Sequence, residues 1–244
     1  MRKRVLPILI GLILVAIGGM ICHSALASAN YDFSALNVVQ YKTEECEIGE
    51  EFINLQIQGD ALDLAFDTSA DGKCRLLFSE SVKGSHTARV EDGTLVVQTA
   101  DDREWYEYLG VNLQKPKVTV LLPLSRYAGL SVDVSDGMVD IPAGLVFENV
   151  NIELDAGEVD CRAVVEQSVE IRMGAGELRL SEMKAGEMSL TTAAASVRLE
   201  NISLDGKLEM NVNAGAVLLR EVGCENLRYA GSLSEARIEH VIAK

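Results

Sequence analysis

The C-terminal half of the chain repeats itself about every 20 residues, and this repeat limits the choice of fold more than any other feature. Six copies align on a central small residue, and successive copies are 19 or 20 residues apart. The central residues are Gly137, Gly157, Gly176, Ala195, Gly215 and Ser234. A repeat this short predicts a stack of equivalent units that bury a core only together.

Apolar and polar residues alternate on both sides of the central residue. In the second copy, Ile152 and Leu154 precede Gly157, and Val159 and Cys161 follow it. A period of two predicts short strands with one buried face. We predict turns between these strands at Gly137, Gly157, Gly176 and Gly215. A further apolar residue is predicted to fill the corner to the next copy in five cases, which are Val164, Met183, Ile202, Val222 and Val241.

One copy cannot fold by itself. It buries about six aliphatic side chains, each worth roughly 1.5–3 kcal/mol. Ordering some 20 residues costs about 1–2 kcal/mol per residue in backbone entropy alone. Stacked copies share both faces and satisfy each other's backbone hydrogen bonds. We therefore predict an all-β fold in which residues 129–244 form a β-solenoid of two-strand coils; hairpins in a sandwich are the alternative.

The first 27 residues differ from the rest of the chain. Three basic residues at positions 2–4 precede an uncharged apolar run over residues 5–22, which is close to the shortest length that spans a bilayer. We predict a single-pass signal-anchor helix in residues 1–27, with a cytoplasmic N-terminus and an extracellular C-terminal domain. A signal peptide cleaved after Ala27, which ends an A-x-A sequence, is the alternative.

The predicted extracellular part is strongly acidic. It contains all 37 acidic residues but only 19 of the 22 basic ones, an excess of 18 acidic residues. Such a surface repels nucleic acid, because phosphate binding requires clustered Lys and Arg side chains. We predict no nucleic-acid partner and a membrane contact only through residues 5–22.

Residues between the anchor and the repeat are less regular. We predict that residues 28–50 form a stalk with a first strand and that residues 51–128 form an N-terminal β part. Asp92 and Gly93 stand between two alternating stretches, which indicates a β-hairpin.

A short stretch in this part is rich in aromatic residues. It contains the only Trp of the chain and two of its six Tyr residues. Trp105, Tyr106 and Tyr108 are the predicted partner contacts, because amphipathic aromatic side chains are enriched at interfaces. Packing of these side chains as a cap over the solenoid end is the alternative.

The order of several motifs resembles a known family. The sequence VEDGTLVVQ is followed by the Trp-containing stretch, by VTVLLPLSRYAGLSVDVSDGMVDI and by repeats that contain AGEV. Over roughly residues 40–240 the chain resembles the putative-adhesin (DUF4097) family of bacterial membrane-anchored proteins. The resemblance implies a β-helical, toastrack-like fold at the cell envelope, often encoded near envelope-stress genes, and it supplies no catalytic residues.

The cysteines indicate a disulfide and a core position. Four of them lie in the predicted extracellular part, where disulfides form. Three pairings are open, and Cys46 with Cys74 is the first candidate because both lie in the less regular part. Cys161 occupies a position that is aliphatic in the other copies, which predicts a core residue.

No motif indicates catalysis, a metal or a cofactor. Ser85 and His86 are adjacent in a polar stretch, predicted as a loop, and lack a third triad member. Residues 67–72 resemble the start of a calcium loop, but Phe78 stands where a bidentate Glu is required.

The charged residues of the repeat follow no ligand pattern. The acidic residues around Gly157 do not recur at fixed positions in other copies, which predicts solvated side chains; they are Asp155, Glu158 and Asp160. We predict ion pairing between neighbouring copies instead. Our alignment places Glu153, Glu170 and Ser189 in one series and Asp160, Arg179 and Arg198 in another.

These features predict a non-enzymatic bacterial surface protein that displays a β-solenoid for binding or adhesion. An accessory role in envelope-stress sensing through a membrane partner protein is the second hypothesis. A carbohydrate-active enzyme built on a β-helix is the third. The expected partner is an envelope protein or a glycan.

Overall fold

The computed structural model describes residues 2–28, 41–82, 84–101 and 115–243. The chain divides into two units, residues 1–40 with 104–114 and residues 41–103 with 115–244. The described part of the first unit is the helix α1 (Arg2–Ser28). Within the described residues, no helix is both long enough and apolar enough to cross a membrane. The anchor in residues 5–22 stays a prediction.

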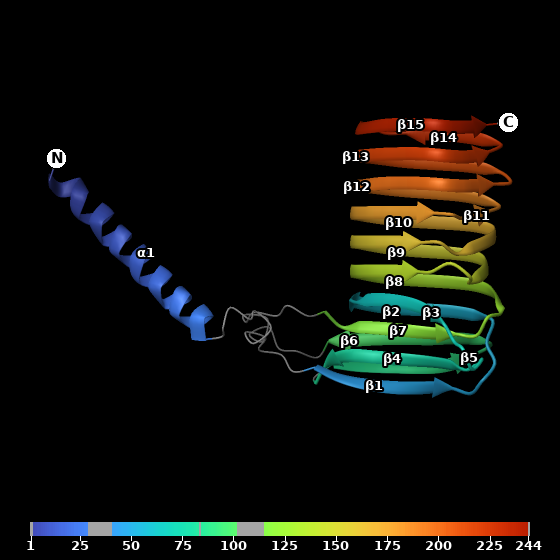
Figure 1. Cartoon of the computed structure of the whole chain (residues 1–244), viewed down its shortest axis with the longest axis horizontal. Coiled ribbons are helices and arrows are strands. Elements are labelled where there is room, and N and C mark those ends of the chain that lie inside the picture. The colour runs from blue at the N-terminus through green and yellow to red at the C-terminus, as the bar shows by residue number, and fades with distance from the viewer. Residues whose placement is uncertain (1, 29–40, 83, 102–114, 244) are drawn as a thin grey trace. The chain divides into compact units, whose positions relative to one another are not determined.

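The second unit is one wound β-sheet (Figure 1). Its described strands are β1 (Tyr41–Ile48), β2 (Asn54–Ala61), β3 (Asp63–Thr68), β4 (Cys74–Ser81), β5 (Gly84–Glu91), β6 (Thr94–Asp101), β7 (Lys117–Leu122), β8 (Arg126–Ile141), β9 (Val146–Cys161), β10 (Val164–Ser181), β11 (Lys184–Ala185), β12 (Glu187–Leu204), β13 (Lys207–Cys224), β14 (Asn226–Ala230) and β15 (Leu233–Ala243).

The strands from β8 onward stack in parallel, one repeat copy per coil. The order is β8, β9, β10, β12 and β13, and the last coil contains β14 and β15. Gly137 pairs with Gly157, which pairs with Gly176, and Gly176 pairs with Ala195. The pairing register therefore equals the repeat of the sequence, and the predicted all-β solenoid is confirmed.

Each central glycine is a corner inside one long strand, where we predicted a turn between two short strands. Phe147 near the start of β9 is buried. From Val150 onward, the buried residues are Val150, Ile152 and Leu154 before the corner and Val159 and Cys161 after it. The buried positions change from even to odd numbers, so both halves of the strand face the core only if the chain bends between them. A short third segment completes the coil, as where β11 pairs with the end of β12.

The glycine corner is required by contact between coils. Gly157 has a φ of +138°, and a Cβ atom there would lie 1.8 Å from the carbonyl oxygen of Gly137. A Cβ atom at Gly176 would likewise lie 1.8 Å from the carbonyl oxygen of Gly157. Ala195 is the exception: its φ lies outside the left-handed region and its side chain is buried.

A second corner follows the glycine corner. In four coils it contains a non-glycine residue with a φ of 52–56°, and these residues are Glu182, Asn201, Glu221 and His240. Met183, Ile202 and Val222 come directly after three of these and are buried, as predicted, whereas Val241 is only partly buried. The β9 coil differs, because Ala163 is fully buried there and Val164 is partly exposed.

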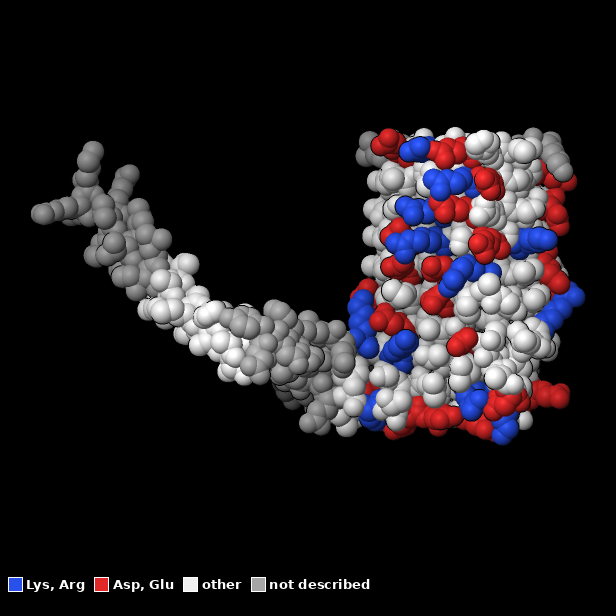
Figure 2. Space-filling view, in the orientation of Figure 1, with Lys and Arg blue, Asp and Glu red and all other residues white. Residues whose placement is uncertain are grey.

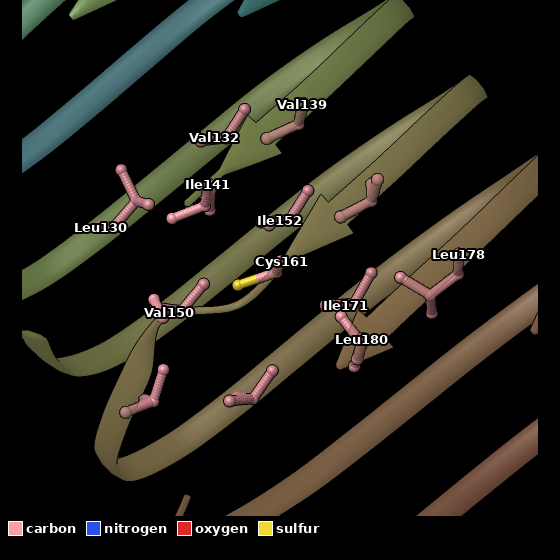
Figure 3. Packing of buried hydrophobic residues seen from close by; sticks show 14 of the residues in the cluster. Leu130, Val132, Val139, Ile141, Val150, Ile152, Cys161, Ile171, Leu178 and Leu180 are labelled. Atoms are coloured by element: carbon pink, nitrogen blue, oxygen red, sulfur yellow. The ribbon is translucent and has the colours of Figure 1, made fainter. Parts of the chain in front are cut away.

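The core is a set of aliphatic columns that run through the stack. Val132, Ile152 and Ile171 lie above one another on one side of the corner (Figure 3). Ile141, Cys161 and Leu180 do so on the other side, and all three are buried. The prediction that Cys161 is a core residue is confirmed.

The stack continues below β8 with strands in a different order from the sequence. β2 and β3 form a coil that pairs in parallel with β8, and β6 and β7 pair in parallel beneath them. β5, β4 and β1 then add antiparallel strands at the end. The predicted hairpin at Asp92 and Gly93 joins β5 to β6, with φ values of 49° and 72° at these residues.

The opposite end of the stack is the coil of β14 and β15. Ile238 and Ile242 of β15 are 54% and 64% exposed, so nothing among the described residues covers this coil.

The corner geometry makes a stability prediction. Gly157→Ala places a methyl group against the Gly137 carbonyl and is expected to lower the free energy of unfolding by about 3 kcal/mol or more. Gly223→Ala is the matched control, because a Cβ atom at Gly223 would have no other atom within 4 Å. It is expected to change the unfolding free energy by less than about 0.5 kcal/mol. Urea unfolding followed by circular dichroism measures both, and equal effects would contradict the corner contact.

The register predicts that one coil can be removed. Ser168 pairs with Glu187, so deleting residues 168–186 joins positions that already occupy equivalent places in adjacent coils. The shortened chain is expected to keep its β circular dichroism signal and a cooperative melting transition. Loss of both would contradict independent, stackable coils. Deleting only about half of these residues is the control and is expected to unfold the stack, because it breaks the register.

Candidate functional site

The predicted aromatic contacts lie outside the described residues. This applies to Trp105, Tyr106 and Tyr108, so both their contact role and the alternative cap stay predictions. A candidate site among the described residues has to come from the outward sides of the coils. Figure 2 shows that charged and uncharged areas alternate over the stack.

The outward residues after the glycine corner form ion pairs between coils. Arg179 of β10 contacts Glu158 of β9 and also hydrogen-bonds Glu177 of its own strand, with Nε 2.9 Å from Oε1. Arg220 of β13 lies 3.2 Å from Glu200 and 3.3 Å from Glu239. Hydrogen bonds from Arg220 and Arg237 lower the pKa of the Glu239 carboxyl. We give the name ion-pair face to the residues whose charges pair with one another on this side, which are Glu158, Glu177, Arg179, Glu200, Arg220, Arg237 and Glu239.

One of the two predicted charge series is correct. Asp160, Arg179 and Arg198 occupy equivalent positions in successive coils. In the other series, Glu170 and Ser189 do pair in register. The placement of Glu153 with them is wrong, because Glu153 pairs with Arg172 and Glu170 pairs with Asn151. The alignment was off by two residues, a shift that leaves both side chains pointing outward.

The carboxylates around Gly157 do not converge. Asp155 is exposed, Glu158 contacts Arg179, and Asp160 lies 3.6 Å from Arg162. Within the described residues, no group of three or more His, Cys, Asp or Glu side chains has a geometry that could hold a metal ion. In the 67–72 stretch, Asp71 accepts hydrogen bonds from Ser69 at 2.7 Å and from Arg75 at 2.9 Å.

His86 belongs to a buried cluster at the antiparallel end. It lies in strand β5 and not in the loop that we predicted, and its ring stacks on Phe78 with centroids 3.7 Å apart. Nδ1 is 2.8 Å from the carboxylate of Glu80, which is buried and also lies 3.3 Å from Lys42. Ser85 is on the exposed side of the same strand. The cluster neutralises a buried carboxylate and ties β1, β4 and β5 together; it does not assemble a Ser–His pair.

The two cysteines of the predicted disulfide lie on neighbouring strands. Both are free thiols; Cys46 pairs in register with Leu76, and Cys74 pairs with Ile48. They are therefore diagonal neighbours on the same side of the β1–β4 pair. Burial raises the pKa of the Cys74 thiol to about 12, with a smaller contribution from Cys46. The disulfide stays a prediction.

The outward residues before the corner form a polar groove near the middle of the stack. One column contains Thr94, Asn54, Gly129, Asn149 and Ser168, from strands β6, β2, β8, β9 and β10. The next column contains Gln56, Ser131, Asn151 and Glu170. These nine residues line a cavity of about 290 Å³, and we name them the amide groove.

The hollow follows from small residues on β8. Gly129 carries no side chain, and a Cβ there would lie 3.0 Å from the Asn54 side-chain oxygen. Ser131 is the smallest side chain of its column. Amide side chains of β2 and β9 line the groove on either side of β8, and Asn149 accepts a hydrogen bond from Ser168 at 2.7 Å. The groove is therefore lined by polar side chains of five adjacent strands and is open to solvent.

Most side chains of the groove are neutral, and their amides and hydroxyls can both donate and accept hydrogen bonds. Glu170 is its only ionisable residue, and it pairs with Arg172. Asn151 Oδ1 is shielded and has no hydrogen-bond partner within the described part of the chain. The groove offers hydrogen bonds without a nucleophile, an acid–base pair or a metal-binding set.

Sequence reasoning did not find this groove. The signal was present, since Asn149, Asn151 and Ser168 stand at outward positions of the aligned copies. The register of Asn54 and Gln56 against β8 could not be inferred, because β2 lies outside the 20-residue repeat.

Solved structures share this architecture. A putative adhesin from Bacteroides fragilis matches with a TM-score of 0.53 and 15% identity over 83% of this chain and 97% of that one. A putative cell adhesion protein from Clostridium sporogenes matches with a TM-score of 0.46 and 12% identity over 82% of this chain and 99% of that one. A putative lipid binding protein from Parabacteroides distasonis matches with a TM-score of 0.47 and 14% identity over 82% of this chain and 98% of that one. The first of these similarities shows the fold, a β-solenoid of this kind.

The sequence identifies the family. The family model described as Toastrack DUF4097 matches residues 52–220, which is more than half of the chain. The protein belongs to the Toastrack DUF4097 family, as the motif order predicted. No protein of curated function matches the chain.

Cys161 makes a chemical prediction. Burial raises the pKa of its thiol to about 12, so at pH 8 only about one molecule in ten thousand carries the reactive thiolate. We expect iodoacetamide to leave Cys161 unmodified in the native protein and to label it fully in urea, as read by peptide mass spectrometry. Equal labelling in both conditions would contradict the core position.

Proposed function

We propose that the protein is anchored at the cell envelope through residues 5–22 and displays its solenoid outside the cell as a non-enzymatic binding module. The amide groove is the observation that carries this proposal. Its lining consists of hydrogen-bonding amides and hydroxyls with Glu170 as the one ionisable residue, and it is built on a scaffold with a fixed register.

The comparisons support a binding role. The names of two structural neighbours refer to adhesion, and the third is named as lipid binding. The ion-pair face differs from the groove, because its Arg and Glu side chains pair with one another between neighbouring coils. We therefore assign stabilisation of the stack to the ion-pair face and binding to the amide groove. The groove contains hydrogen-bonding groups but no reacting group.

The N-terminal sequence supports the anchor and its orientation. Three basic residues precede the uncharged apolar run, and α1 is helical through this run. Positive charge on the cytoplasmic side then places the solenoid outside. The cleaved form would carry the same solenoid and would differ only in being released.

The proposed location and binding are tested with the full-length chain. In intact cells, external protease is expected to remove the solenoid and to leave a short membrane-associated fragment. Purified full-length protein in detergent is expected to sediment with isolated cell envelopes in a saturable way. A solenoid that is protected from protease until the cells are lysed, or protein that does not sediment with envelopes, would contradict the proposal.

A further inference from the structure

We propose that the amide groove binds an uncharged polysaccharide chain that runs across the strands, along the stack. This inference rests on the proposed binding function and adds the chemical class of the ligand. It is carried by the arrangement of neutral hydrogen-bonding side chains on five adjacent strands.

The hydrogen-bonding groups of the groove match hydroxyl groups. A sugar hydroxyl is both a donor and an acceptor, and so are the amide side chains of Asn and Gln taken as a whole. Asn54 and Gln56 of β2 and Asn149 and Asn151 of β9 lie on either side of β8. A chain that crosses these strands therefore meets donors and acceptors on successive strands along its length.

The charge of the groove selects a neutral ligand. The exported part of the chain has 18 more acidic than basic residues, and the groove contains no Lys or Arg. Phosphate, sulfate and carboxylate polymers would bring negative charge to an acidic surface without a cation to pair with. Glu170 is held by Arg172, so the groove also lacks a free carboxylate for a cationic ligand.

The lining also disfavours a lipid. The apolar residues among its lining, Leu55, Leu130 and Val150, are each at most 2% exposed, because they point into the core. A hydrocarbon chain would thus contact polar side chains and leave their hydrogen bonds unmade, which is costly.

The orientation follows from the two columns. Equivalent positions in neighbouring strands lie about 4.7–4.9 Å apart, so five strands give a binding track of roughly 19 Å. The columns run perpendicular to the strands, and the lining residues of the groove extend over all five strands. A linear chain of a few sugar units fits this track, and each coil contacts a different unit.

Asn151 supplies an independent observation. Its side-chain oxygen is shielded from solvent and lacks a hydrogen-bond partner among the described residues, whereas Asn149 beside it in β9 has two, Ser168 and the Ala128 carbonyl. An acceptor of this kind is destabilising, because its lost hydration is not replaced by another hydrogen bond. Rotation of the Asn151 side chain toward the groove would bring this oxygen to a ligand hydroxyl and remove the cost.

The test compares two matched substitutions in the full-length protein in detergent. Ser131→Leu fills the groove with an apolar side chain, and Ser189→Leu makes the same change in the same column, further along the stack in β12 and outside the groove. The probes are neutral cello-, chito- and malto-oligosaccharides, with polygalacturonate and an extended Gly-Ser peptide as comparisons. Binding is measured by isothermal titration calorimetry and by saturation-transfer NMR.

We expect at least one neutral oligosaccharide series to bind, with affinity that rises with chain length up to a few units. Ser131→Leu is expected to lower this affinity at least tenfold and Ser189→Leu less than twofold. Asn151→Ala is expected to lower it about fivefold. The absence of binding by every neutral series, preferential binding of polygalacturonate or the peptide, or equal effects of the two Ser→Leu changes would overturn the inference.

The envelope sedimentation assay separates this inference from the proposed function. If Ser131→Leu still sediments with envelopes as the unchanged protein does, the protein binds, but through another surface, and the groove inference fails. If the unchanged protein does not sediment with envelopes at all, the proposed function fails. Retained melting temperature in the Ser131→Leu variant shows that the loss comes from the groove.

Discussion

The structure depends on the close contact between the glycine corner of one coil and the corner carbonyl of the coil before it. A Cβ at Gly157 or Gly176 would lie 1.8 Å from that oxygen, and at Gly215 it would lie 2.0 Å from the Ala195 oxygen. At these three corners the coils can approach to hydrogen-bonding distance only because the side chains are absent. Ala195 keeps its side chain at the same position because its φ lies outside the left-handed region and its methyl group is buried. The same contact allows the strands to pass through the corner without interrupting their parallel pairing, so each coil fixes the register of the next.

A fixed register divides the surface into columns with separate roles. The inward positions have to be aliphatic, because they form columns through the core. The outward positions do not have to be aliphatic, and different types of residue occupy them before and after the corner. After the corner, Arg179 and Arg220 join neighbouring coils through carboxylates. Before the corner, amides and hydroxyls make up most of the lining of the amide groove, and the next outward positions carry the charges of Asp133, Glu153 and Arg172. The amide groove is therefore distinct from the ion-pair face.

The sequence predicted the features that its local period contains. The repeat indicated the coil register and the core position of Cys161, and the adjacent Asp92 and Gly93 indicated the hairpin. It did not show that the strand continues through the corner. One bent strand and two separate strands give the same alternation of apolar and polar residues on both sides of Gly157. The placement of β7 beneath β3 was also hidden, since these strands are adjacent in space but far apart in the chain. The Glu153 series failed because a shift of two residues keeps a side chain on the same face.

The amide groove shows why the fold and the proposed site depend on each other. Asn54 and Gly129 are 75 residues apart in the sequence, yet they are partners in register, and Asn149 and Ser168 continue the same column. A slip of one residue between β2 and β8 would turn Asn54 and Gln56 toward the core and bring Leu55 to the surface. The burial of Leu55 at 2% exposure and of Leu130 beneath the groove opposes that slip. The aliphatic core therefore holds the polar columns in line, and a binding track across five strands requires no further structure than the stack itself.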